Sequence, residues 1–97
     1  MSDLPDQQAF AEARGEPFEM VVDDARVPLV LADVTSLGES ASVGTRDPFS
    51  LVFHAPAEAL HPQRIYRLEH ERLGAMDLFL VPLGPEGDAM RYEAVFT

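Results

Sequence analysis

The chain has 97 residues, so we expect one small domain with a thin hydrophobic core. It contains no cysteine. Seventeen acidic residues against seven basic ones, all arginine, give a formal net charge of −10. Because this surface repels phosphate groups, we expect no nucleic-acid partner and no anionic membrane partner. The lack of cysteine excludes disulfides, iron–sulfur clusters, thiol catalysis and cysteine-ligated zinc.

The N-terminal residues 1–6 are acidic and lack the basic and apolar segments of a signal peptide. The longest uncharged apolar run, residues 78–84, contains Pro82 and is far shorter than the roughly 20 residues that span a bilayer. We therefore expect a cytoplasmic protein, or one exported within an assembly without a signal of its own.

Residues 4–14 are the only segment with helical signals. Asp3 is the predicted N-cap, and Gly15 follows the segment where a left-handed residue commonly ends a helix. A helix of about 11 residues is not stable alone in water. We therefore predict that residues 1–15 form a short N-terminal helix, which docks on a sheet through Phe10.

After the helix, apolar and polar residues alternate with a period of two, which is typical of half-buried strands. A turn is predicted at Asp24-Ala25-Arg26, and Pro28 indicates a strand start or an edge. The Ser-, Thr- and Gly-rich residues 35–47 form the longest irregular stretch, of the kind that is often functional or mobile. The predicted strands are residues 18–23, 27–34, 48–54, 64–71, 76–83 and 90–96.

No helical segment separates these strands, which excludes a βαβ architecture. The sequence therefore predicts a single, mainly β domain over residues 1–97, with a β-meander over 18–97. We expect a small antiparallel barrel or sandwich of about six strands with one short N-terminal helix. The inward-facing residues predicted to form its core are Phe49, Leu51, Phe53, Tyr66, Leu68, Leu78, Leu80, Tyr92 and Phe96.

Residues 76–83 are apolar on both faces, which indicates a strand that is central in the sheet or covered. Opposite the core rows, four strands also carry outward apolar residues. If these strands are neighbours, the residues form an apolar patch that the N-terminal helix covers only in part. This predicted interaction surface comprises Val52, Ile65, Val81 (or Phe79 on the same strand) and Val95.

Few residues suggest catalysis or metal binding. Ser50 and His54 lie about 13 Å apart if the strand is regular, too far for the hydrogen bond of a nucleophile–base pair. His54, His61 and His70 lack the spacing of metal ligands. We therefore predict no catalytic residue, no metal site and no cofactor.

Glu69 and Glu71 would share a strand face at a separation of roughly 7 Å, which falls in the range of an inverting glycosidase pair. The same face is predicted to carry Arg67, Arg91 and Glu93. Because alternating charges of opposite sign on a strand face are typical of cross-strand ion pairs, we interpret these carboxylates as structural.

Several segments together form a recognisable pattern, of which residues 66–82 are the most specific part. They are Phe10, Gly15, Phe18, residues 49–53, Pro56, Gln63, residues 66–70, Leu73-Gly74, residues 78–82 and residues 92–96. This pattern resembles a family of small bacterial domains of about a hundred residues, classified only as a domain of unknown function. The resemblance implies a mostly β domain, an association with genes for phage-tail-like fibres and collar proteins, and no catalytic residues to transfer.

We expect a non-enzymatic protein-interaction or structural module of a phage-tail-like or other multiprotein assembly, which binds a protein partner or forms a homo-oligomer. The alternative is a small-ligand-binding protein or enzyme with a site at the barrel mouth, near Tyr66, His70 and Tyr92. A cavity of about 300 Å³ or more there would favour this alternative. A third hypothesis is a regulatory or chaperone-like protein whose acidity shields a basic partner, and salt-sensitive binding would favour it.

Overall fold

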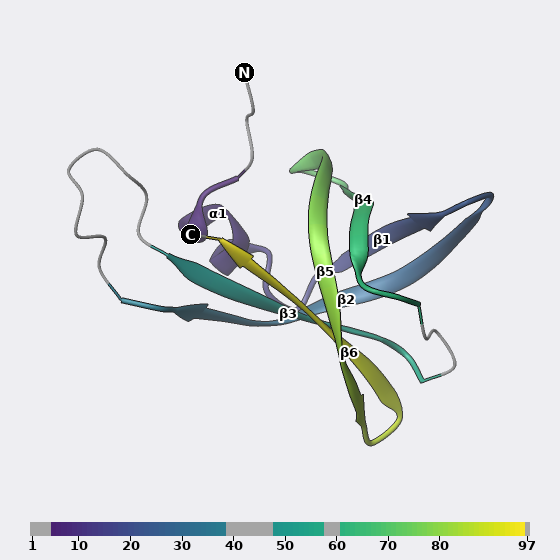
Figure 1. The fold of residues 1–97 in the computed structure, drawn as a ribbon. Helices are drawn as coiled ribbons and strands as arrows, with labels where there is room; N and C mark the ends of the chain where they lie inside the picture. Colours follow the sequence, from purple (N-terminus) through teal and green to yellow (C-terminus); the bar gives the residue numbers. More distant parts are fainter. Residues whose placement is uncertain (1–4, 39–47, 58–60, 97) are drawn as a thin grey trace.

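The computed structural model describes residues 5–38, 48–57 and 61–96. The structure of this part of the chain is a closed antiparallel barrel, in which the strand order is β1-β2-β3-β6-β5-β4 (Figure 1). The prediction of a small, mainly β domain of about six strands is thereby confirmed. Of the two predicted architectures, barrel and sandwich, the structure is the barrel. Its elements are α1 (Gln7–Glu12), β1 (Pro17–Val22), β2 (Ala25–Ser36), β3 (Phe49–Pro56), β4 (Arg64–His70), β5 (Gly74–Glu86) and β6 (Ala89–Phe96).

The last three strands, β4 to β6, form a meander, as predicted for the last third of the chain. The meander does not extend over all of residues 18–97, because β3 and β4 follow each other in sequence but are not neighbours. Instead β6 pairs with β3, and β4 pairs with β1 through a short ladder centred on Met20 and Leu68. This last ladder closes the barrel.

The helix is shorter than predicted, because it begins after Asp6 rather than after Asp3. The backbone of Asp6 is extended, and its carboxylate accepts a hydrogen bond from the Ala9 amide at 2.9 Å, which makes Asp6 the N-cap. Asp3 lies outside the described residues. Gly15 has a φ of +87°, the left-handed conformation predicted for it, and its amide donates to the Leu31 carbonyl at 2.7 Å.

The first hairpin turns earlier than predicted. Val22 pairs with Ala25, so the turn is Asp23-Asp24, and Asp23 adopts a φ of +52°. Of the two alternatives predicted for Pro28, a strand start and an edge, the structure shows the edge, since Pro28 lies inside β2. It is tolerated there because this part of β2 is paired with β1 alone, whereas the ladder with β3 begins at Val30. Of the irregular stretch predicted at 35–47, Thr35 and Ser36 belong to β2, and residues 39–47 lie outside the described residues.

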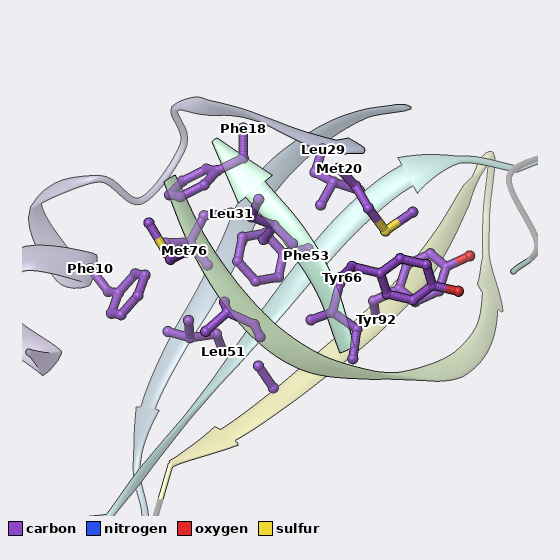
Figure 2. Packing of buried hydrophobic residues seen from close by; sticks show 14 of the residues in the cluster. Phe10, Phe18, Met20, Leu29, Leu31, Leu51, Phe53, Tyr66, Met76 and Tyr92 are labelled. Atoms are coloured by element: carbon purple, nitrogen blue, oxygen red, sulfur yellow. The ribbon is translucent and has the colours of Figure 1, made fainter. Parts of the chain in front are cut away.

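Every residue predicted for the core is buried, and aromatic rings occupy much of the barrel interior (Figure 2). The rings of Phe49 and Phe96 stack with their centroids 4.5 Å apart. Phe10 of α1 packs against both rings, with centroid separations of 6.1 and 5.6 Å, and is fully buried. The predicted docking of the helix through Phe10 is therefore confirmed, and Phe10 joins the core rather than covering the outer face.

Candidate functional site

The four strands that carry the predicted interaction surface are consecutive neighbours in the order β3-β6-β5-β4. On their outer side, Ile65 of β4 pairs in register with Phe79 of β5. These two side chains are 65% and 52% exposed, and Val95 of β6 is 53% exposed. We call the surface formed by Ile65, Phe79 and Val95 the outer apolar face.

Val52 and Val81, the other two predicted members, are half-buried. They lie in one row across the sheet, but Glu93 of β6 stands between them, because it pairs with both. A charged residue thus interrupts the continuous patch that alternation alone predicted. Phe79, proposed from the sequence only as the alternative to Val81, is the more exposed of the two.

The outer face of β5 is not covered by the described residues, so of the two alternatives expected for this strand, central or covered, the structure shows the first. β5 is central, since it pairs with β4 and β6, but Phe79 and Leu83 remain exposed. The helix does not cover this face, because its buried residue Phe10 points into the barrel end, toward Phe49 and Phe96.

The pairing between β5 and β6 stops within the sheet. Their ladder runs from Glu86 and Ala89 to Val81 and Glu93. Beyond it, residues 75–80 pair with β4 alone and residues 94–96 pair with β3 alone. Figure 1 shows the two strands diverging, with β6 running toward α1 and β5 toward the β4–β5 turn. We call this opening between the diverging strands the seam.

Two carboxylates flank the outer apolar face. Asp77 precedes Phe79 by two residues, and Glu93 precedes Val95 by two residues, so each shares the outer side of its strand. Neither forms an ion pair with another described residue. Arg67, which is opposite Asp77 in register, instead donates from Nε to Glu69 at 2.9 Å.

The alternative site at the barrel mouth is not assembled. The hydroxyl of Tyr66 donates to the Pro62 carbonyl, and the amide of His61 donates to the Tyr92 hydroxyl at 2.9 Å. Burial raises the pKa of Tyr92 above its ordinary value of 10.0, although the hydrogen bond from His61 opposes this shift. The two tyrosines lie together, far from Phe10 (Figure 2). His70 is four residues further along β4, which corresponds to about 13 Å.

His70 instead belongs to an interaction network at the β4–β5 turn. Its Nδ1 accepts hydrogen bonds from the amides of Arg72 and Leu73, both at 3.1 Å. The hydrogen in the neutral ring must therefore be on Nε2, which lies 2.8 Å from Oε1 of Glu16. The same Glu16 oxygen accepts from Nη2 of Arg72 at 2.6 Å. With both ring nitrogens engaged, His70 is not arranged to take a proton from a substrate.

A cleft of about 510 Å³ opens beside this network. It opens outward where β1 and β4 continue past the end of their ladder, and its lining combines exposed Pro17, Pro28 and Glu71 with the inward-facing Phe18 and His70. Of the three residues named for the ligand-binding alternative, His70 lines this cleft, and Tyr66 and Tyr92 do not. Its lining comprises Pro17, Phe18 and Glu19 of β1, Pro28 of β2, Glu69 and His70 of β4, and Glu71 of the following turn.

The carboxylates at this cleft are arranged for ion pairing rather than for acid catalysis. Hydrogen bonds from Arg26 and then Arg67 lower the pKa of Glu69, whereas a general acid requires a raised pKa. Arg26 also pairs with Glu19 at 3.2 Å. Of the charges expected to pair across strands, only Arg67 and Glu69 form an ion pair, and both lie on β4. The cross-strand pairs instead join Arg26 of β2, which the sequence pattern did not identify, to Glu19 and Glu69. Glu71, Arg91 and Glu93 form no ion pair with another described residue.

The three histidines lie apart from one another. His54 on β3 is 3.8 Å from Glu86, His61 precedes β4, and His70 is in the turn network. Within residues 5–38, 48–57 and 61–96, no group of three or more histidine or acidic residues is placed to hold a metal ion. In the same part of the chain, no helix is long and apolar enough to cross a membrane.

Comparisons with known proteins give a family but no activity. Neither the curated proteins nor the solved structures contain a match to the chain. A family described as "Domain of unknown function (DUF6916)" matches residues 5–96, which include all six strands and α1. The chain therefore belongs to this family of domains of unknown function.

Proposed function

We propose that this domain is a non-enzymatic protein-interaction module that contacts its partner through the outer apolar face. The observation that carries the proposal is the exposure of Ile65, Phe79 and Val95, each by more than half, on three neighbouring strands. Ile65 and Phe79 are neighbours in register, and Val95 lies across the seam from them on β6. Large apolar side chains exposed on the outer side of a small domain are typical of a surface that another protein covers. None of these residues contributes to the barrel core, so stability does not explain them.

The charges around the face favour a partner that is apolar and basic. Asp77 and Glu93 lack ion-pair partners among the described residues, and the chain has a formal net charge of −10. A second copy would bring the same carboxylates and the same net charge, which opposes association. We therefore propose a different protein as the partner, and the sequence resemblance favours a component of a phage-tail-like or other multiprotein assembly.

The main competing function is binding of a small ligand in the outer cleft. The volume of about 510 Å³ supports it, because small-molecule sites commonly have 300–1,000 Å³. Against it, the carboxylate of Glu69 and both ring nitrogens of His70 are already occupied by protein groups. We therefore place this function second.

The proposal is tested by comparing the wild-type protein with the double variant Ile65→Glu/Val95→Glu and with Val30→Glu. Val30 is a matched control, because it is 44% exposed on β2, outside the outer apolar face. Proteins retained from host extract by wild type and control are purified, and their binding to all three forms is measured by calorimetry. We expect the double variant alone to lose binding.

Equal binding by all three forms would refute the outer apolar face as the interface. Sedimentation of the free proteins addresses the partner's identity. A wild-type dimer that the double variant abolishes would assign the face to a second copy and would contradict the argument from charge.

A further inference from the structure

We infer that the partner adds a strand to the free edge of β5 at the seam, over residues 75–80, with apolar side chains and a basic one alternating along it. This inference rests on the proposed function and specifies how the partner binds. Side chains can cover an apolar face in many ways, but a free strand edge admits one geometry, because its backbone groups require a paired strand.

The edge at residues 75–80 is long enough to hold a strand. Six residues in extended conformation span about 20 Å, close to the usual length of a strand in globular proteins. One side of this segment is paired with β4. On the other side, no described strand is in register, since the ladder with β6 begins only at Val81. The amides and carbonyls that point to this side form a template for a further strand.

The helix leaves this edge open. α1 packs against β2, and its Phe10 reaches the rings of Phe49 and Phe96 on β3 and β6. It therefore packs on the β2-β3-β6 side of the seam (Figure 1). The segment that follows it reaches the β4–β5 turn, where Glu16 is bonded to His70 and Arg72. A strand entering the seam would pair with β5 on one side, and its inward side chains would meet the part of the core that contains Phe10 and Met76 (Figure 2).

The side chains along β5 specify the added strand. Inward-facing Met76, Leu78 and Leu80 are buried, so partner residues on that side must be apolar. The outward residues Asp77 and Phe79 would lie beside outward partner residues. A Lys or Arg next to Asp77 would neutralise a carboxylate that has no ion pair among the described residues, and an apolar residue would cover Phe79.

The probe is an eight-residue peptide with valine at every inward position and with lysine and leucine alternating at the outward positions, so that they lie beside Asp77 and Phe79. Its charge-reversed form carries glutamate in place of lysine. Two further forms of the lysine peptide carry N-methyl groups on either the odd or the even amides. Because only every second amide of an added strand faces the edge, one methylated form must lose binding and the other must keep it. We expect amide NMR shifts in residues 75–80 on binding and loss of at least about tenfold in affinity for the glutamate peptide.

A charge exchange provides the matched variants. Asp77→Lys should lose affinity for the lysine peptide and gain affinity for the glutamate peptide, whereas Asp88→Lys, in the β5–β6 turn at the other end of β5, should change neither strongly. Failure of the lysine peptide to bind at millimolar concentration would overturn the inference. Binding that both methylated peptides retain would also overturn the inference. So would binding that changes the amide NMR shifts of residues outside 75–80 instead. In all these cases the calorimetric test of Ile65 and Val95 still decides the proposed function independently.

Discussion

His70 and Glu16, 54 positions apart in the sequence, are joined by a hydrogen bond of 2.8 Å between Nε2 and Oε1. The bond connects the segment after α1 to the turn between β4 and β5. His70 can donate it because its Nδ1 already accepts the amides of Arg72 and Leu73. A Glu–His pair beside a cleft resembles part of a catalytic site, but here the histidine terminates a strand and caps the following turn.

The capping role of His70 predicts an ordered series of stabilities. His70→Ala leaves the amides of Arg72 and Leu73 without their acceptor and should lower the free energy of unfolding by about 1–3 kcal/mol. His70→Asn should lose less, because its side-chain carbonyl can accept from amides two and three residues ahead. Urea denaturation of both variants measures the difference. Equal losses would show that the turn amides do not depend on this acceptor.

Glu16 should contribute to stability in a defined pH range. The hydrogen bond from Arg72, and then that from His70, lower the pKa of this carboxyl below its ordinary value of 4.5. A carboxyl with a lowered pKa in the folded protein stabilises it above about pH 4.5, and the contribution is lost as the pH falls through the folded-state pKa. The stability difference between wild type and Glu16→Gln should therefore shrink below pH 4.5.

Urea midpoints between pH 7 and pH 3 measure this difference. Glu71→Gln is the control, since Glu71 is exposed and forms no ion pair with another described residue. A pH-independent difference between wild type and Glu16→Gln would contradict the assignment of the ion pair to the folded state.

Phe53 is the clearest test of the barrel core. It is fully buried, and its ring meets that of Phe18 edge-on at a centroid distance of 5.3 Å. Phe53→Ala should cost about 3–5 kcal/mol, a large part of the stability of a domain of this size. Val95→Ala, at an exposed position, should change the free energy of unfolding by less than about 0.5 kcal/mol. A Phe53→Ala protein with an unchanged melting temperature would refute the core assignment.

Phe10 tests whether the helix is part of the folding unit. Because its ring packs against Phe49 and Phe96, Phe10→Ala should also cost about 3–5 kcal/mol, whereas Gln8→Ala on the exposed side of α1 should be nearly neutral. Hydrogen exchange should show faster exchange in α1 of the Phe10 variant. If stability and exchange both stay at wild-type levels, the helix does not contribute to the core.

Much of the fold could be predicted from local patterns. Period-two alternation placed Phe49, Leu51 and Phe53 on the inner side of β3, because burial of one face forces this spacing on any strand. The predicted helix begins three residues too early, since Asp3 and Asp6 are both chemically suited to cap it and the sequence does not distinguish them, and it ends two residues too late. For Pro28 the sequence leaves a strand start and an edge open, and the structure shows the edge, because the ladder of β2 with β3 begins only at Val30.

By itself, the sequence determined the mainly β fold class, the core rows of β3 to β6 and which side of those strands faces outward, since these depend on short-range periodicity. The tertiary structure decided what lies beside each outward residue. Glu93 separates Val52 from Val81, Phe79 pairs with Ile65, and the ladder between β5 and β6 stops at Val81 because the two strands diverge there. Strand order and register join residues distant in the chain, and no local pattern in a single sequence encodes them.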